Sequence, residues 1–353
     1  MTSPFDPSSP PPAAPWSAPP PVPATPRRRG IRKRWVVAAV VVALVGVGGF
    51  QVWQREQTYQ TGHAAYLAAD CAAAVGPLRT VAEAESGSGA SDVVLKATAE
   101  LLECEAVMAA DDLGTQGRPG EAVLAYSEFV VKFPRSPLKD LAVTNGRAAI
   151  TADPDRVATT DVCDALDALE AQQLIATPAE TLPPLLYACG QAYEADGEFA
   201  DALATYAQFR DDYPEHALAD DVDAAFARAT LAETTTANPG DLPPPNAMGP
   251  GGTAGLATIV IQNGSPDELN MVFSGPDVRV EEIEACTDCV KVFGVATDAC
   301  EREGPMAEYV VSPGTYQVVV KSGSGSSVRP FRGTWTLEAG QEYASCFYIA
   351  TGL

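Results

Sequence analysis

The sequence of 353 residues is poor in the residues and motifs on which most enzymes depend. It has only two histidines, His63 and His216, and we expect both to lie on the surface of a helical region rather than to act as bases. No serine occupies the centre of a GxSxG elbow, and no glycine-rich phosphate loop follows a predicted strand. The spacing of a calcium-binding loop is also missing. We therefore predict that the protein is not an enzyme and that it binds no metal ion and no cofactor.

Basic residues are also scarce. The chain has 23 Lys and Arg against 46 Asp and Glu, which gives a net charge of −23. Six of the basic residues cluster between Arg27 and Arg34, so the rest of the chain is more acidic still. A protein that binds nucleic acid needs the opposite sign of charge. The composition therefore excludes nucleic acid as a partner and indicates a well-solvated acidic surface.

Long hydrophobic runs are absent, with one exception. Residues 35–53 carry no charge over 19 positions. As a helix this run would extend roughly 28 Å, close to the ~30 Å core of a bilayer. The basic cluster before it predicts that the N-terminus lies in the cytoplasm. Phe50 to Trp53 offer no small-residue cleavage site, so we expect an uncleaved single-pass transmembrane helix in contact with the lipid bilayer and extracytoplasmic C-terminal domains.

Composition divides the rest of the chain. Residues 1–34 hold eleven prolines and few large apolar groups, which predicts a disordered, Pro-rich cytoplasmic tail ending in the basic cluster. Residues 233–254 string Pro and Gly together without periodicity and indicate a linker. This linker would separate two domains, at 55–232 and 255–353. In the first domain apolar residues recur every three or four positions, which predicts an all-α fold.

The predicted helical domain is a duplication, with copies at about 60–150 and 157–232. The segment at 121–138 aligns without gaps with the segment at 201–218, at an offset of 80 residues. Each copy also carries two cysteines, and an even number of cysteines in an oxidising compartment predicts disulfides. The duplication pairs these cysteines within each copy, as Cys71–Cys104 and Cys163–Cys189.

Eight residues of the second copy stand at the spacing of a known helical repeat, namely Gly190, Ala192, Tyr193, Gly197, Phe199, Ala202, Tyr206 and Pro214. They resemble the signature of the tetratricopeptide repeat family, most of all the repeats of bacterial envelope lipoproteins and division coordinators. The resemblance implies a helix-turn-helix unit in which small Gly190 and Ala202 let two helices approach and Gly197 forms the turn. The first copy has five extra residues before Gly117, so we expect its hairpin to be looser.

The C-terminal domain changes to the two-residue period of strands. Its short β-rich runs lie at 257–263, 268–275, 307–314, 315–322, 333–340 and 342–349. About six or seven such strands predict a small all-β antiparallel sandwich. The run PGTYQVVV at 313–320 resembles transthyretin-like and carboxypeptidase-regulatory accessory domains of cell surfaces.

Four cysteines lie in this domain, at Cys286, Cys289, Cys300 and Cys346. We expect structural disulfides, and three pairings remain open. The CTDC motif that begins at Cys286 could instead exchange disulfides, but the carboxylates around it would raise the thiol pKa and weaken the nucleophile. A zinc site is a third interpretation, although the second CxxC knuckle of a zinc ribbon is missing.

These observations predict a membrane-anchored extracytoplasmic scaffold or adaptor. We expect it to bind a protein or peptide partner of the bacterial cell envelope through its repeats. No Lys/Asn clamp for a peptide carboxylate is evident, so we predict no contact residues. Two alternatives stay open: a thiol-disulfide redox protein that uses Cys286 and Cys289, and a sensor that binds a cell-wall ligand through the C-terminal sandwich.

Overall fold

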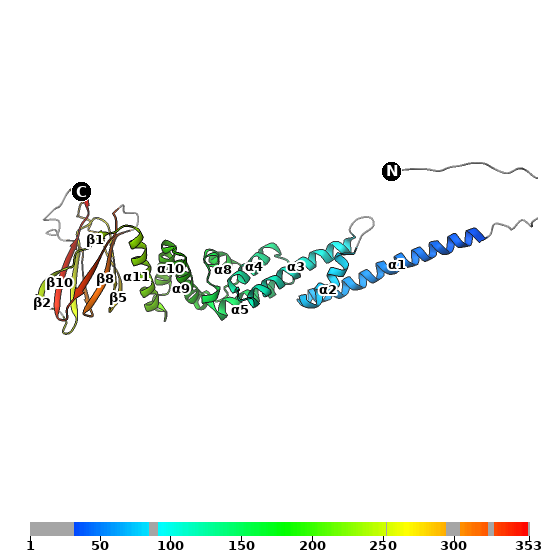
Figure 1. The fold of residues 1–353 in the computed structure, drawn as a ribbon, viewed down its shortest axis with the longest axis horizontal. Coiled ribbons are helices and arrows are strands. Elements are labelled where there is room, and N and C mark those ends of the chain that lie inside the picture. The colour runs from blue at the N-terminus through cyan, green and yellow to red at the C-terminus, as the bar shows by residue number, and fades with distance from the viewer. Residues whose placement is uncertain (1–31, 85–90, 252, 294–303, 324–327, 352–353) are drawn as a thin grey trace, which may run out of the picture. The chain divides into compact units, whose positions relative to one another are not determined.

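The computed structural model describes residues 32–84, 91–251, 253–293, 304–323 and 328–351, with the backbone alone at 32–49, 292–293 and 351 (Figure 1). The tail predicted at 1–34 lies almost entirely outside the described residues. The chain divides into two compact units, Met1–Gln57 and Thr58–Leu353. The second unit contains the predicted repeats and all the described strands.

Eleven helices are formed by the described residues: α1 (Arg32–Leu67), α2 (Cys71–Ala82), α3 (Asp92–Thr115), α4 (Pro119–Lys132), α5 (Lys139–Ala152), α6 (Pro154–Val157), α7 (Thr160–Asp164), α8 (Leu166–Ala171), α9 (Pro178–Asp196), α10 (Phe199–Asp212) and α11 (Ala219–Thr236). Local signals set their ends. The carboxylate of Asp70 accepts a hydrogen bond from the Ala73 N–H at 3.0 Å and caps α2. Pro178 stands in the first turn of α9, where its missing N–H costs nothing.

The structure contradicts the predicted fold class in its membrane component. Among the residues whose side chains are described, no helix has the length and apolar character needed to cross a membrane. The span predicted at 35–53 falls within α1, where side chains are described only from Phe50 onward. The prediction rested on a run of apolar residues, and the side chains of most of these residues are not described.

The helices follow the duplication in their order. α4 and α10 begin at Pro119 and Phe199, and α5 and α11 begin at Lys139 and Ala219, so both pairs are 80 residues apart, the offset seen in the sequence. In each copy three successive helices pack against one another, α3 with α4 and α5 in the first and α9 with α10 and α11 in the second. The helical core contains residues of both copies.

The turn of the first hairpin is not looser than that of the second. Gly117 and Gly197 both adopt a left-handed conformation, with φ of +81° and +80°, which glycine accepts without strain. Each donates its N–H to the carbonyl three residues earlier, at 3.1 Å in both cases. The five extra residues lengthen α3 instead, because Cys104 lies 13 positions before Gly117 whereas Cys189 lies 8 positions before Gly197.

The C-terminal part of the chain forms three sheets from the described strands β1 (Gly240–Asp241), β2 (Asn246–Pro250), β3 (Ala257–Asn263), β4 (Leu269–Ser274), β5 (Val278–Ile283), β6 (Val292–Phe293), β7 (Met306–Val311), β8 (Gly314–Ser322), β9 (Phe331–Leu337), β10 (Gln341–Phe347) and β11 (Ala350–Thr351). A five-stranded sheet has the order β1-β9-β8-β4-β5 and a four-stranded sheet the order β2-β10-β3-β7. β11 and β6 form a small third sheet. Side chains of the two larger sheets share one core, which includes Ile259, Phe273, Trp335 and Tyr343.

The sheets are mixed, which corrects the prediction of a purely antiparallel sandwich. β3 pairs with β10 in parallel, from Thr258 opposite Glu342 to Asn263 opposite Phe347. β1 with β9 and β6 with β11 are also parallel. The two strands of each parallel pair are separated by long stretches of sequence, and parallel neighbours require such crossovers. The sequence pattern identifies strands but does not reveal these long-range pairings.

The segment predicted as a linker, 233–254, is largely built into the fold. Its first residues end α11 at Thr236, and β1 and β2 add edge strands to the two larger sheets. The Trp335 Nε1–H donates to the Pro243 carbonyl at 2.9 Å, and the Leu242 N–H donates to the Arg332 carbonyl at 2.9 Å. Proline and glycine are compatible with edge strands, where a missing N–H leaves no neighbour unpaired.

Helix α11 joins the helices to the sheets, and Figure 1 shows it beside β5 and β8. One side of α11 contributes Val222, Ala225 and Ala229 to the helical core. The other side packs Ala227 against Val272 and Val319 of the five-stranded sheet. Its small alanines permit close approach on both sides. The lysine side chain of Lys321 also pairs with the carboxylate of Glu233.

Candidate functional site: the repeat surface and the disulfides

Each copy of the helical repeat is cross-linked by the disulfide that the duplication predicted. Cys71–Cys104 joins α2 to α3 with 5.1 Å between the Cα atoms, and Cys163–Cys189 joins α7 to α9 with 5.5 Å. All four residues are buried. These two predictions are confirmed. Since buried disulfides between packed helices offer no thiol to substrates, their role is to stabilise the scaffold.

A tyrosine fastens the helices of each copy through a carboxylate. In the first copy the Tyr126 hydroxyl donates to Asp111, and Asn145 of α5 donates to the same oxygen at 3.0 Å. In the second copy the Tyr206 hydroxyl donates to Glu194 at 2.7 Å. Burial, followed by the hydrogen bond to the neighbouring carboxylate, raises the pKa of both phenols well above the ordinary value.

Arg228 of α11 adds a further partner to the Tyr206–Glu194 contact of the second copy. Its Nε and Nη2 atoms donate to the two oxygens of Glu194 at 2.8 and 2.7 Å. The Glu194 side chain is only 13% exposed, so the bidentate guanidinium holds a charge that water cannot fully solvate. The carboxylate in this copy therefore connects all three helices.

The signature residues of the second repeat lie where their predicted tasks require. Gly190 contacts the ring of Tyr206, and a side chain at this position would collide with it. Ala202 is fully buried on α10, and Gly197 forms the turn. The remaining signature residues are a buried tyrosine, two half-buried residues and an exposed proline after α10, namely Tyr193, Ala192, Phe199 and Pro214. These placements explain the hairpin but single out no ligand.

The exposed face of α3 carries an apolar stripe. Five residues spaced by four, three, four and three positions form this α3 stripe. Leu95, Ala99, Leu102 and Ala109 are exposed, and Ala106 is half-buried against the helical core. Leu95 and Leu102 are 59% and 55% exposed. By helical spacing, carboxylates border the stripe on both sides, with Asp92 and Glu103 on one and Glu105 and Asp112 on the other. The spacing was present in the sequence, but α3 has a second apolar stripe that packs in the core and masked it.

The two histidines occupy different environments. His63 is half-buried, and its Nδ1 lies 2.8 Å from Oε1 of Glu100, which also accepts from the Tyr59 hydroxyl at 2.8 Å. The Nδ1 atom of His216 accepts the N–H of Leu218 at 3.2 Å, and its ring meets Phe209 edge-on. The first arrangement links α1 to α3, and the second stabilises the turn between α10 and α11.

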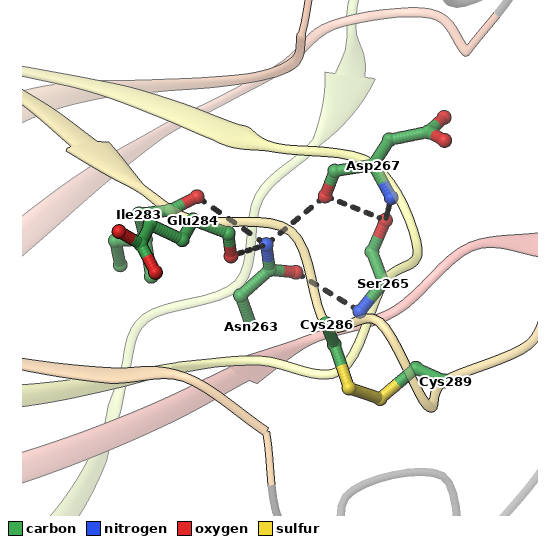
Figure 2. The surroundings of a disulfide bond; sticks show 7 residues. All are labelled: Asn263, Ser265, Asp267, Ile283, Glu284, Cys286 and Cys289. Atoms are coloured by element: carbon green, nitrogen blue, oxygen red, sulfur yellow. Dashed lines mark hydrogen bonds between the residues drawn. A yellow bond between two sulfur atoms is a disulfide. The ribbon is translucent and has the colours of Figure 1, made fainter.

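The cysteines of the CTDC motif are joined to each other in the described structure, with 5.2 Å between the Cα atoms. Figure 2 shows the disulfide beside a polar loop in which Asn263 is fully buried. The Asn263 amide donates to the carbonyls of Asp267 and Glu284 at 3.0 and 2.9 Å. The Cys286 N–H donates to the Ser265 carbonyl at 2.9 Å. Because Cys286 and Cys289 are only 3% and 6% exposed, this geometry favours a structural disulfide.

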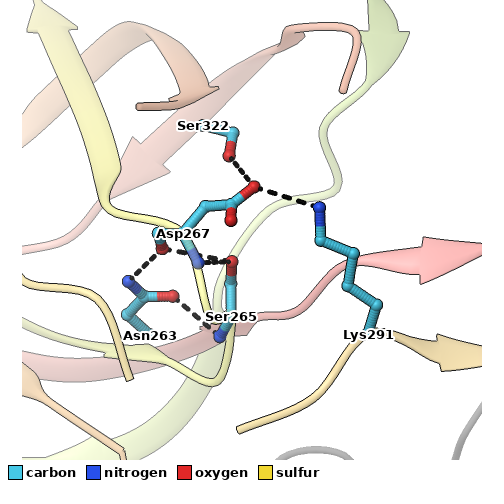
Figure 3. A network of polar contacts seen from close by, with 5 residues as sticks. All are labelled: Asn263, Ser265, Asp267, Lys291 and Ser322. Carbon is cyan, nitrogen blue, oxygen red and sulfur yellow. Dashed lines mark hydrogen bonds and ion pairs between the residues drawn. The ribbon is translucent and has the colours of Figure 1, made fainter. Parts of the chain in front are cut away.

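A second group of contacts fixes the same loop from outside (Figure 3). The Asp267 carboxylate accepts from Ser322 at 3.2 Å and lies 3.4 Å from the ammonium of Lys291. Ser265 donates to the Asp267 carbonyl through its hydroxyl at 3.1 Å and accepts the Asp267 N–H at 2.9 Å. These links hold the loop after β3 against the end of β8. Asn263 was not predicted from the sequence, because the carbonyls of Ile283 and Glu284 that it contacts lie about 20 residues away and only folding brings them together.

The other two predicted cysteines are less defined. Cys346 is disulfide-bonded, whereas Cys300 lies outside the described residues. Within the described ranges no three His, Cys, Asp or Glu side chains group as a metal site would require. The described part of the chain thus offers buried cross-links and an exposed helical surface. No family model and no curated protein matches this chain.

Proposed function

We propose that the protein is an extracytoplasmic scaffold of the bacterial cell envelope, whose tetratricopeptide-like helices bind a protein partner. The α3 stripe carries this proposal. Leu95 and Leu102 are both more than half exposed and lie with alanines on one helix face, and a contiguous apolar surface of this kind marks sites of protein interaction. The two buried disulfides support an oxidising compartment, where thiols are joined as the protein folds.

The charge around the α3 stripe indicates the chemistry of the partner. Residues 58–236 contain 30 Asp and Glu but only 10 Lys and Arg. A second copy of the chain would bring like charges together, which costs free energy at an interface. Two of the bordering carboxylates, Asp92 and Glu105, already pair with Lys96 and Arg79. A partner helix with an apolar stripe would cover the leucines, and flanking Lys or Arg would complement the net negative charge of these helices. We therefore commit to a basic amphipathic helix of another protein.

Binding of a defined peptide tests this proposal. The probe is a synthetic helix of Leu and Lys in heptad spacing, titrated into the full chain and followed by calorimetry. We expect binding that weakens as salt is raised, because the carboxylates contribute through long-range attraction. The L95S/L102S variant should bind at least tenfold more weakly, since it removes the apolar contacts but keeps every charge.

A matched substitution distinguishes binding at the α3 stripe from nonspecific hydrophobic binding. Met248 of β2 is an apolar residue that is 65% exposed and lies far from α3 in the sequence, so it serves as the control. M248S should leave peptide affinity unchanged. If L95S/L102S binds the peptide as well as the unaltered chain does, the α3 stripe is not the docking surface. In cells, a photo-crosslinker at Leu102 should capture a protein whose purified form also loses affinity for L95S/L102S.

A further inference from the structure

Strand β7 forms one edge of the four-stranded sheet, and no described strand pairs with the side of it that faces away from β3. Its six residues, Met306–Val311, include neither glycine nor proline and carry a single charge, at Glu308. They pair with β3 in unbroken register over their whole length. An edge of this kind presents a continuous row of backbone groups to which another strand can add.

The other described edges of the two larger sheets have features that hinder strand addition. β1 has only two residues. β2 contains Gly249 and Pro250, and its register shifts opposite Glu342 and Tyr343. In β5 three of the six residues are charged, and α11 packs against this strand. Short, irregular or charged edges resist pairing, and of these features β7 has only the one charge.

The hydrogen bonds to β3 show which residues of β7 face away from it. The Asn263 N–H donates to the Pro305 carbonyl at 2.8 Å, and the same register sets these two residues opposite each other. Bonded and non-bonded pairs alternate along an antiparallel ladder. The odd-numbered residues of β7 therefore bond to β3, and Met306, Glu308 and Val310 direct their N–H and C=O groups outward. Within the described ranges these outward groups have no partner.

This outward row has a defined end and a defined chemistry. The next outward N–H, that of Ser312, donates to the Asp277 carboxylate, so the row ends at Val310. Glu308 is exposed at the centre of the row and forms no ion pair with a described residue. On either side of it lie Met306, which is 69% exposed, and half-buried Val310. The row therefore reads apolar, acidic, apolar.

A second copy of the chain does not suit this edge. Only outward residues can bond to each other, so full antiparallel overlap of two β7 strands would place Glu308 directly opposite its counterpart. Like charges directly opposite each other destabilise a strand pair. The net charge of −23 on each chain adds to this repulsion.

We propose that β7 binds an extended segment of another protein as an additional antiparallel strand, with a Lys or Arg opposite Glu308 and apolar residues opposite Met306 and Val310. Main-chain hydrogen bonds supply the affinity of such a complex, and the alternating side chains supply its specificity. This surface shares no residue with the α3 stripe, so either proposal can fail without the other.

Amide exchange of the full, oxidised chain, followed by NMR, tests this surface. The probe is acetyl-Thr-Val-Thr-Lys-Thr-Val-Thr-amide, in which Lys can face Glu308 while the two Val face its neighbours. We expect the peptide at millimolar concentration to slow exchange of the Met306, Glu308 and Val310 amides in a saturable way. Exchange of the Ala307 and Tyr309 amides, which already bond to β3, should change less.

Two methylated peptides separate strand addition from simple charge attraction. Methylation of the backbone nitrogen of Lys removes an N–H that points toward β7, and this peptide should not bind. Methylation of the backbone nitrogen of the following Thr alters an N–H that points to solvent, and this peptide should bind as well as the unmethylated one. Both keep the same charge and composition.

Substitutions in the chain complete the test. E308K should weaken binding roughly fivefold or more and should favour a peptide with Glu in place of Lys. V310P removes one outward N–H but no bond to β3, as proline allows on an edge strand, and should also weaken binding. E282K makes the same charge change as E308K on an exposed residue of edge strand β5 and should have no effect.

Each comparison has an outcome that would overturn the proposal. These outcomes are equal binding of the two methylated peptides, equal weakening by E308K and E282K, and no slowing of exchange by the unmethylated peptide. Sedimentation of the chain alone tests the other occupant. A dimer of the unaltered chain that V310P separates would show that a second copy takes this edge, and would also overturn the proposal.

Discussion

Helices α3 and α9 hold the same place in the two copies, yet their surroundings differ. α9 packs against α5, α6, α7, α10 and α11, whereas α3 packs against α2, α4 and, less extensively, α5. Tyr59 and Tyr66 of α1 also donate hydrogen bonds to Glu100 and Glu103 of α3. As a result α9 has almost no exposed apolar residue, and α3 presents Leu95 and Leu102 to solvent. The comparison teaches that one duplicated unit can serve two purposes. The second copy is enclosed by other helices and continues into the sheets, and the first leaves an apolar face of α3 exposed.

The largest expected effect comes from removing the disulfide that lies within each copy of the repeat. They close loops spanning 33 and 26 positions, whereas the Cys286–Cys289 disulfide spans 3. The loop-entropy relation gives a loss of about 3.5 to 4 kcal/mol for C71A/C104A and for C163A/C189A, but about 2 kcal/mol for C286A/C289A. Urea unfolding of the three double variants measures these free energies. Equal losses from all three would show that loop length does not govern their contribution.

Helix contacts in the second copy should respond next most strongly. Gly190 lies seven residues before Gly197, and the first copy has buried Ala110 seven residues before Gly117. G190A would press a methyl group into the Tyr206 ring, and such overpacking costs about 1 to 3 kcal/mol.

Two glycine and alanine exchanges control for helix propensity. Gly76 of α2 has open space where its Cβ would lie, so G76A should stabilise the chain by about 0.5 to 1 kcal/mol. A110G should destabilise it by about 1 kcal/mol through propensity and by a further amount because it removes a buried methyl group. The midpoint of thermal unfolding ranks the three variants. A stabilised G190A would mean that the second hairpin is looser than described.

Local patterns in the sequence were sufficient to predict the disulfides and the turn glycines of the helical copies. The duplication paired Cys71 with Cys104 and Cys163 with Cys189, because repeated units repeat their contacts. It also placed both turn glycines. The added length of α3 was assigned to the turn, since a count of residues does not distinguish a longer helix from a longer loop. The parallel pairing of β3 with β10 and the partners of Asn263 depend on residues distant in sequence, and no local pattern encodes them.

The tyrosine–carboxylate hydrogen bonds of the two copies should contribute differently to the free energy of unfolding, and removing each tyrosine hydroxyl measures the difference. Glu194 is mostly buried, so water cannot replace the hydroxyl of Tyr206 in full, and Y206F should cost about 1.5 kcal/mol. Asp111 is exposed, and water can take the place of Tyr126, so Y126F should cost about 0.5 kcal/mol. Urea unfolding at neutral pH compares them. A larger cost for Y126F would contradict the difference in burial.

Alkaline titration of the buried tyrosines compares the helices with the sheets. We expect their ionisation to have no effect on stability at neutral pH. Burial is the first cause that raises the pKa of Tyr309 and of Tyr316 to about 12. In the helices the pKa values of Tyr126 and Tyr206 are raised further, by burial and by hydrogen bonds to Asp111 and Glu194. Tyr316 also donates to a carboxylate, that of Asp277 at 3.2 Å, but its pKa rises less. An unfolded tyrosine ionises near pH ~10. The folded state therefore holds these protons more tightly, and the stabilisation is complete below that pH and is lost as the pH rises through about 12. Phenolate absorbance should show Y309F and Y316F removing the earlier part of the buried titration, whereas Y126F and Y206F remove the later part. The reverse order would place the stronger restraint on tyrosine ionisation in the sheets.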